Sequence, residues 1–178
     1  MKRNSFLFFL LCFIALRAFP GGGSEITIPA DAESKLLITI PPNDGNKLSN
    51  GGKIKIMRYI ELPPEAKTRS ENMKYVAFDV LIDNSNGRTD IAFMASESPF
   101  LLRDSNGFEY PAKLFSRDII KPAFTNSDIG QGDLLRGWIT YEVPLGITLN
   151  DLRIRLVADN YSLKIPTVTS GWTTFSGF

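Results

Sequence analysis

The fold is decided by the stretch YVAFDVLID, residues 75–83. Every second residue in it is apolar, and these residues are Val76, Phe78, Val80 and Ile82. Side chains of a strand alternate between its two faces, and β-branched and aromatic residues suit a pleated surface. The stretch therefore predicts a strand with one buried face. It places Asp79 on the opposite face, where we expect water.

Alternation with a period of two recurs on both sides of this strand. We predict further strands at residues 36–40, 53–62, 91–95, 100–103, 108–110, 138–143 and 152–156. The Asn106-Gly107 pair predicts a hairpin between two of them, because Asn and Gly accept the positive φ angles of tight turns. Residues 113–132 lack a clear period and are interpreted as a long loop. Seven to eight short strands without a long helix predict an all-β protein, an antiparallel β-sandwich.

An export signal precedes the strands. Basic residues 2–3 are followed by an apolar run at residues 6–16 and by small residues between positions 18 and 24. A helix that crosses a bilayer needs about 20 residues, so this run is too short to span a membrane. We interpret residues 1–23 as a cleaved signal peptide and expect a secreted or periplasmic protein without a transmembrane span. Two alternatives stay open, an uncleaved interfacial helix and lipidation of Cys12.

The rest of the chain is predicted to form one domain. We expect residues 24–52 to be an N-terminal strand and a turn-rich lead-in, and residues 53–178 to form the sandwich with a C-terminal extension. Cleavage leaves 17 basic against 19 acidic residues, a net charge near −2. Nucleic acid needs a basic surface that offsets its phosphates, so this balance disfavours nucleic acid as a partner.

The composition lacks the residue types on which most catalytic sites depend. The chain has no histidine and its one cysteine lies in the signal, so the mature domain lacks disulfides and the groups that most catalytic and zinc sites use. The acidic residues near predicted loops are Glu97, Asp104, Glu109, Asp118 and Asp128. A carboxylate hydrolase needs two acids on either side of the bond that it cleaves, whereas these acids are interpreted as solvated surface residues. We therefore expect that the protein is not an enzyme.

Two groups of turn residues offer oxygen ligands for Ca²⁺. The first consists of Asp83, Asn84, Asn86 and Asp90, and the second consists of Asp104, Asn106 and Glu109. Neither group has the spacing of a loop that wraps the ion, and turn formation explains both groups. We expect no metal and no cofactor.

Three segments that follow one another along the chain are KYVAFDVLIDN (74–84), FLLRDSNGFEY (100–110) and LRGWITYEVP (135–144). Together they resemble a bacterial family of secreted or lipid-anchored immunoglobulin-like proteins of unknown function, related to the mycobacterial immunoprotective extracellular antigen. The resemblance implies an immunoglobulin-like sandwich and supplies no catalytic residues. Tyr141 stands where the family usually has Phe, and the family's lipidation cysteine is missing. Some members carry a label borrowed from a telomere-binding protein, which the charge balance here does not support.

The candidate residues for partner contact are the aromatic residues Trp138, Phe115 and Phe124. Exposed aromatic side chains are frequent at interfaces, although Trp138 has the alternative of covering a sheet face beneath the long loop. We expect a non-catalytic extracytoplasmic interaction module that binds a protein or a cell-envelope component. The alternative is a small-ligand or carbohydrate-binding module, which clustering of the three aromatic residues around one groove would favour.

We predict that export cleaves the chain between Ala18 and Ser24, because the apolar run is too short to span and small residues follow it. Intact-mass measurement of the exported protein checks this prediction. A mass that retains Met1, or a diacylglyceryl adduct on Cys12, would contradict it.

Overall fold

The computed structural model describes residues 37–40, 45–62, 71–93, 99–112, 120–125, 127–160 and 165–177. The expected signal peptide at residues 1–23 and the candidate Phe115 lie outside these ranges. Among the residues described there is no helix with the length and apolarity that a membrane crossing needs.

The first sheet is built around the stretch YVAFDVLID, residues 75–83. Its strands are β1 (Leu37–Thr39), β2 (Asn46–Lys47), β3 (Lys53–Glu61), β4 (Met73–Asp83) and β7 (Leu134–Pro144). They are ordered β1-β3-β4-β7, and β2 pairs with another part of β3. Strand β4 is central, since it pairs antiparallel with β3 on one side and with β7 on the other. Strands β1 and β2, from the segment expected to be a lead-in, both belong to this sheet.

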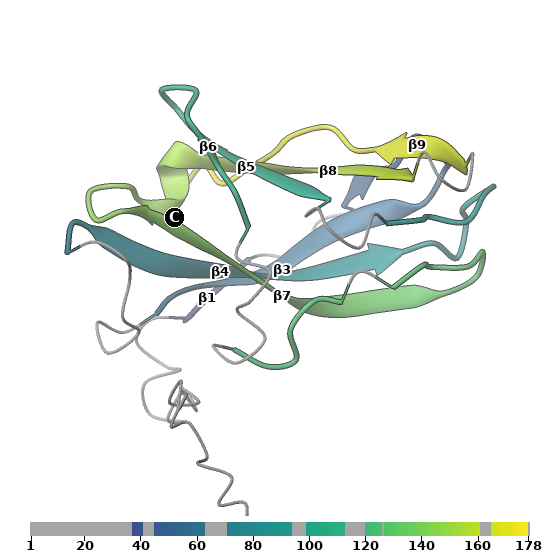
Figure 1. The fold of residues 1–178 in the computed structure, drawn as a ribbon, viewed down its shortest axis with the longest axis horizontal. Coiled ribbons are helices and arrows are strands. Elements are labelled where there is room, and N and C mark those ends of the chain that lie inside the picture. Colours follow the sequence, from purple (N-terminus) through teal and green to yellow (C-terminus); the bar gives the residue numbers. More distant parts are fainter. Residues whose placement is uncertain are drawn as a thin grey trace, which may run out of the picture.

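The second sheet lies over the first, and the two layers are visible in Figure 1. Its strands are β5 (Phe100–Asp104), β6 (Glu109–Tyr110), β8 (Leu152–Asn160), β9 (Ile165–Thr169) and β10 (Thr173–Thr174). They are ordered β10-β8-β5-β6, and β9 pairs with another part of β8. A 3₁₀ turn, η2 (Leu149–Asp151), comes directly before β8.

The predicted all-β sandwich is confirmed as two antiparallel sheets of five strands each. The predicted hairpin is present, because β5 and β6 pair with Leu102 opposite Tyr110 and the turn glycine Gly107 has a φ of 92°. Strands β2, β9 and β10 raise the number of strands in the described part to ten. The strand expected at 91–95 is represented by one antiparallel bridge between Ile91 and Ile129.

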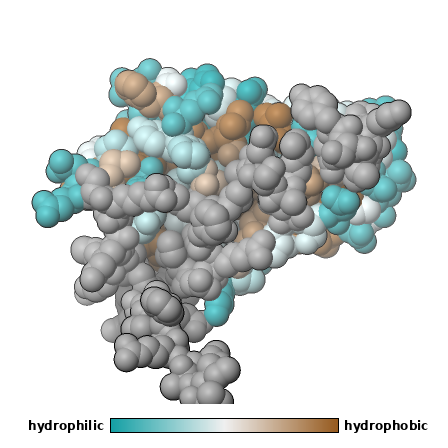
Figure 2. Space-filling view, viewed as in Figure 1, coloured by the Kyte–Doolittle hydropathy of each residue, from teal (hydrophilic) through white to brown (hydrophobic). Residues whose placement is uncertain are grey.

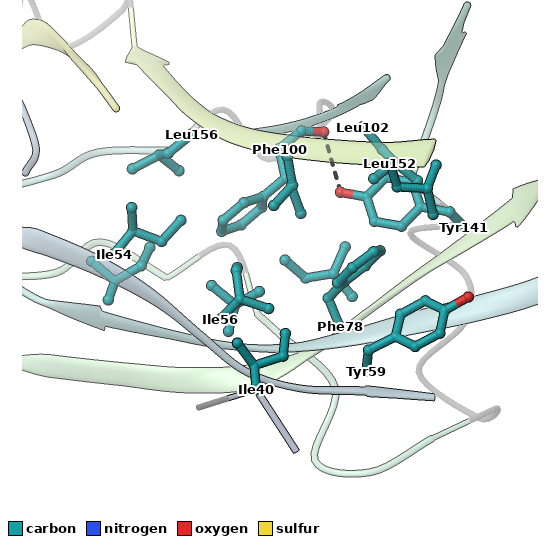
Figure 3. Packing of buried hydrophobic residues seen from close by; sticks show 14 of the residues in the cluster. Ile40, Ile54, Ile56, Tyr59, Phe78, Phe100, Leu102, Tyr141, Leu152 and Leu156 are labelled. Atoms are coloured by element: carbon teal, nitrogen blue, oxygen red, sulfur yellow. Dashed lines mark hydrogen bonds between the residues drawn. The ribbon is translucent and has the colours of Figure 1, made fainter. Parts of the chain in front are cut away.

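The core lies between the two sheets (Figure 3). The four apolar residues of β4 that the alternation predicted as buried are fully buried: Val76, Phe78, Val80 and Ile82. The ring of Phe78 contacts three aromatic rings, with centroid distances of 5.2 Å to Tyr59, 6.0 Å to Tyr141 and 5.4 Å to Phe175. The hydroxyl of Tyr141 donates to the carbonyl of Phe100 at 3.5 Å, so it links β7 to β5 across the sandwich. Burial raises the pKa of that hydroxyl.

The expectation that the opposite face of the first sheet meets water is wrong. Asp79 is only 1% exposed, and Thr140 and Glu142 are also buried. The reason is a second apolar cluster on this face, which consists of Ile60, Leu62, Ala77, Ile120 and Trp138. A β-bulge between Ile56 and Arg58 shifts the alternation of β3, so that this strand contributes to both clusters.

The two sheets also meet along their edges. Leu48, next to β2, forms an antiparallel bridge with Ser170, next to β9. On the opposite side, Ala112 follows β6 and forms an antiparallel bridge with Tyr141 of β7. Backbone hydrogen bonding therefore closes the sandwich at both of these places.

We predict that Phe78→Ala lowers the free energy of unfolding by about 3–5 kcal/mol, since truncating a buried aromatic residue removes its contacts and leaves a cavity. Urea denaturation measures the loss. The matched control is Phe108→Ala, because Phe108 is 68% exposed, and we expect a change within about 0.5 kcal/mol there. Equal and small losses at the two positions would contradict the burial of Phe78 between the two sheets.

Candidate functional site

Trp138, the first candidate for partner contact, is 6% exposed and lies in the second cluster. The register of the first sheet places Arg58, Asp79 and Trp138 side by side on β3, β4 and β7. The guanidinium of Arg58 lies 4.9 Å from the centroid of the Trp138 ring. Trp138 therefore packs within a row that the three strands build together.

The Asp79 carboxylate is the ionic centre of this row. Arg58 Nε donates to it at 2.7 Å, and Arg136 donates twice, from Nε at 2.9 Å and from Nη2 at 2.6 Å. Burial raises the pKa of Asp79, but the hydrogen bonds from Arg136 and Arg58 outweigh burial and hold the pKa below its usual value of 3.8. Two strands flanking β4 thus each send one arginine to a single buried carboxylate.

Phe124 lies in a different environment from Trp138. It is partly buried against the main core, with ring centroids 4.9 Å from Phe100 and 5.9 Å from Phe93. Its backbone runs beside β7, where Phe124 N donates to the carbonyl of Trp138 at 2.8 Å. A Cβ on Gly137 would lie 2.6 Å from the Phe124 backbone, so this close approach requires glycine.

The structure does not bring Trp138 and Phe124 into one groove, because their rings belong to clusters on opposite faces of the first sheet. Phe115 lies outside the described residues. Partner contact through these aromatic residues stays a prediction.

The acidic residues near the loops are engaged in local bonds. Buried Asp104 accepts from the backbone of Asn106 and Phe108 and from the hydroxyl of Tyr110, at 2.7–3.0 Å. The pKa of Tyr110 is raised to about 12, mainly by burial and to a lesser extent by the hydrogen bond to Asp104 and the negative charge of that residue. Asp128 accepts from the backbone of Phe93. Glu109 accepts from Arg103 Nε at 3.1 Å. Glu97 and Asp118 lie outside the described residues.

The first of the two candidate calcium groups centres on Asn84, which is buried and forms a polar junction. Its Nδ2 donates to the carbonyls of Thr89, Ile129 and Gly130, and its Oδ1 accepts from Asn50. The amide thus ties together three turns instead of facing an ion. Across the described ranges no group of three or more acidic residues is placed to hold a metal.

The second sheet carries a charged surface that the sequence analysis did not single out. We call it the Trp172 face, and it consists of the side chains of Arg103, Arg153, Arg155 and Trp172. The three guanidinium carbons lie 5.0, 5.1 and 4.8 Å from the centroid of the Trp172 ring. An aromatic ring attracts cations within about 6 Å, so all three arginines interact with one indole.

Strand pairing explains why these residues meet. Arg103 lies opposite Arg153, and Arg155 lies two residues further along β8 on the same outer face. Trp172 comes directly before β10, which pairs with β8 through Thr173 opposite Ile154. Arg153 and Arg155 alternate with the buried residues Leu152, Ile154 and Leu156, which places both arginines on the outward side of β8. The indole above them gave no local signal, because Trp172 stands in an irregular segment.

The positive charge of the Trp172 face is only partly balanced by the described residues. Arg103 pairs with Glu109, through Nε at 3.1 Å and also through Nη2. The Nε–H groups of Arg153 and Arg155 are buried and have no acceptor among the residues described. Buried donors without acceptors are costly, and guanidinium groups are suited to carboxylate and phosphate oxygens.

A cavity of about 240 Å³ adjoins the same tryptophan. Its lining comes from both sheets and consists of Gly45, Asn46, Ile54, Ile56, Trp172, Thr173 and Thr174. Asn46 Nδ2 donates to Thr173 Oγ1 at 2.7 Å, a bond between β2 and β10. Trp172 is therefore shared by the arginines and by a small, largely polar cavity.

Large apolar side chains that reach the surface are dispersed over the described residues. They are Phe108, Leu134 and Leu145. Figure 2 shows one face of the molecule, where hydrophilic residues occupy the periphery and apolar residues show between them. Charge and hydrogen bonding, more than apolar contact, distinguish the Trp172 face.

Comparison with known proteins adds a structural likeness. No known protein family matches the sequence, and no curated protein matches it. The structure is similar to that of a candidate lipoprotein, YcdA, from Bacillus subtilis, with a TM-score of 0.48 and 14% sequence identity. The likeness covers 75% of this chain and 39% of that chain, so this chain spans less than half of the length of YcdA.

We predict that Asp79→Asn destabilises the domain by about 2 kcal/mol at neutral pH, because two arginines lose their shared carboxylate while remaining partly screened by water. The lowered pKa means that the Asp79 contribution is present above the unfolded pKa and is lost as the pH falls through the folded pKa. Urea denaturation at about pH 7 and at about pH 3 measures this loss. The difference in the free energy of unfolding between wild type and Asp79→Asn should be smaller at about pH 3 than at about pH 7.

The control for this prediction is Asp90→Asn, at an exposed aspartate that accepts one hydrogen bond from the backbone of Gln131. It should cost less than Asp79→Asn at neutral pH. A variant at Asp79 that is as stable as wild type at neutral pH would show that the buried ion pairs contribute nothing net.

Proposed function

We propose that the protein is a non-catalytic extracytoplasmic module that binds an anionic component of the cell envelope through the Trp172 face. The observation that carries the proposal is the convergence of three guanidinium groups on one indole, with a single described carboxylate, Glu109, beside them. Like charges held this close repel one another, and an anion relieves that repulsion. Arginine clusters are a common means of recognising anionic groups.

The non-catalytic part of the proposal is supported by the acids of the described residues. Asp79 is held by two arginines and Asp104 by its own turn and Tyr110. Such acids are committed to structure, whereas a general acid or base must reach a substrate.

The extracytoplasmic part is supported by the short apolar run at residues 6–16 and by the motifs that resemble secreted immunoglobulin-like proteins. We also propose that the protein is related to the family of the mycobacterial immunoprotective extracellular antigen. A small-ligand or carbohydrate-binding module remains the second candidate function, and the cavity beside Trp172 is the observation that favours it.

We predict that Arg155→Gln weakens association of the exported protein with envelope fractions of the producing cell by about tenfold, since a hydrogen-bonded charge contributes roughly 1.5–3 kcal/mol. Co-sedimentation at increasing salt measures this, and wild type should be released by salt because the contact is ionic. The matched control is Arg88→Gln, which removes the same charge from an exposed arginine near Asn50.

Equal release of the two variants would exclude the Trp172 face as the binding surface. Turnover of a glycoside or an ester that disappears on a single Asp or Glu substitution would contradict the non-catalytic proposal.

A further inference from the structure

Trp172 belongs to two compartments of different chemistry. One is formed by the three arginines, whose guanidinium carbons lie within 5.1 Å of its ring centroid. The other is the cavity, which Trp172 lines together with the polar residues Asn46, Thr173 and Thr174. A ligand that occupies both compartments must carry a negative charge and neutral hydrogen-bonding groups a short distance apart.

The size of the cavity limits what can enter it. Pockets for drug-sized ligands hold roughly 300–1,000 Å³, so a cavity of about 240 Å³ suits one small unit. Amide and hydroxyl side chains can both donate and accept, which matches the hydroxyl groups of a sugar. The lining also includes the apolar residues Ile54 and Ile56 and the aromatic residue Trp172, and such residues match the C–H surface of a sugar ring.

The arginines add a requirement that a neutral sugar does not meet. Neither Arg153 nor Arg155 forms an ion pair with a carboxylate among the described residues, whereas Arg103 pairs with Glu109. A planar carboxylate matches the guanidinium fork. Inorganic phosphate would satisfy the arginines alone and would leave the cavity unused.

From this juxtaposition we infer that the Trp172 face binds an acidic sugar, with the carboxylate of a hexuronic acid unit on Arg153 and Arg155 and the hydroxyls of that unit or its neighbour in the cavity. The inference rests on the proposed function, because it names the anion that the Trp172 face recognises.

The test uses the exported protein and isothermal titration calorimetry with three probes. These are oligosaccharides of hexuronic acids (galacturonic and glucuronic), a neutral glucose oligosaccharide, and inorganic phosphate. We expect saturable binding of a hexuronic acid oligosaccharide, at least about tenfold tighter than binding of the other two probes, which corresponds to about 1.4 kcal/mol.

Two variants test the contributions of the cavity and of the arginines separately. Thr173→Val removes the hydroxyl that accepts from Asn46 while keeping the shape of the side chain, and it should weaken hexuronate binding about threefold to tenfold and leave phosphate binding unchanged. Arg155→Gln should weaken binding of both anions. Arg88→Gln is the control with the same change of charge, and thermal unfolding of each variant checks that the fold is kept.

The outcomes distinguish the inference from the proposed function. The acidic-sugar inference would be overturned if phosphate bound as tightly as hexuronate, or if Thr173→Val left hexuronate binding unchanged. Either result would still agree with the proposal that the Trp172 face binds anions. Preference for the neutral sugar would overturn it in favour of the carbohydrate-binding alternative. If no anion binds and envelope association is insensitive to Arg155→Gln, both the acidic-sugar inference and the proposed function are wrong.

Discussion

The ring of Phe78 is the contact on which the sandwich depends, because it touches partners from both layers. Tyr59 and Tyr141 reach it from the strands that flank β4, and Phe175 reaches it from the segment after β10. The chain has one cysteine and therefore cannot form a disulfide between its own sheets, so close packing of this kind has to hold them together. Tyr141 also links the two sheets by a hydrogen bond, since its hydroxyl donates to the Phe100 carbonyl of the opposite sheet.

The middle of the first sheet is buried on both faces, around Ala77 and Asp79, and this explains where sequence reasoning succeeded and where it failed. Alternation identified the core face of β4 and the β5–β6 hairpin, because both depend on residues that are neighbours in sequence. It could not reveal the burial of Asp79, since the two arginines that hold this carboxylate come from β3 and β7. The bulge after Ile56 is a second non-local feature, because it brings Arg58 into register with Asp79.

The candidate site shows the same limit. The arginines of β8 could be placed on an outward face from their alternation with Leu152, Ile154 and Leu156. That an indole covers them depends on the path of the chain from β9 to β10, where no periodic pattern exists. Phe175, in the same segment, belongs to the core for the same reason. Aromatic residues in irregular segments are therefore positioned by tertiary contacts that one sequence does not display.

The bridges at the edges of the sandwich bear on how the protein behaves when many copies are crowded together. Unpaired strand edges act as templates for other chains, and this leads to fibrils and domain swapping. Here the backbone groups beside β2 and β7 are taken up at the Leu48–Ser170 and Ala112–Tyr141 bridges. Annealing of a second chain at either place would first have to break bonds within the molecule. Pairing between copies of the chain is therefore disfavoured at these two places.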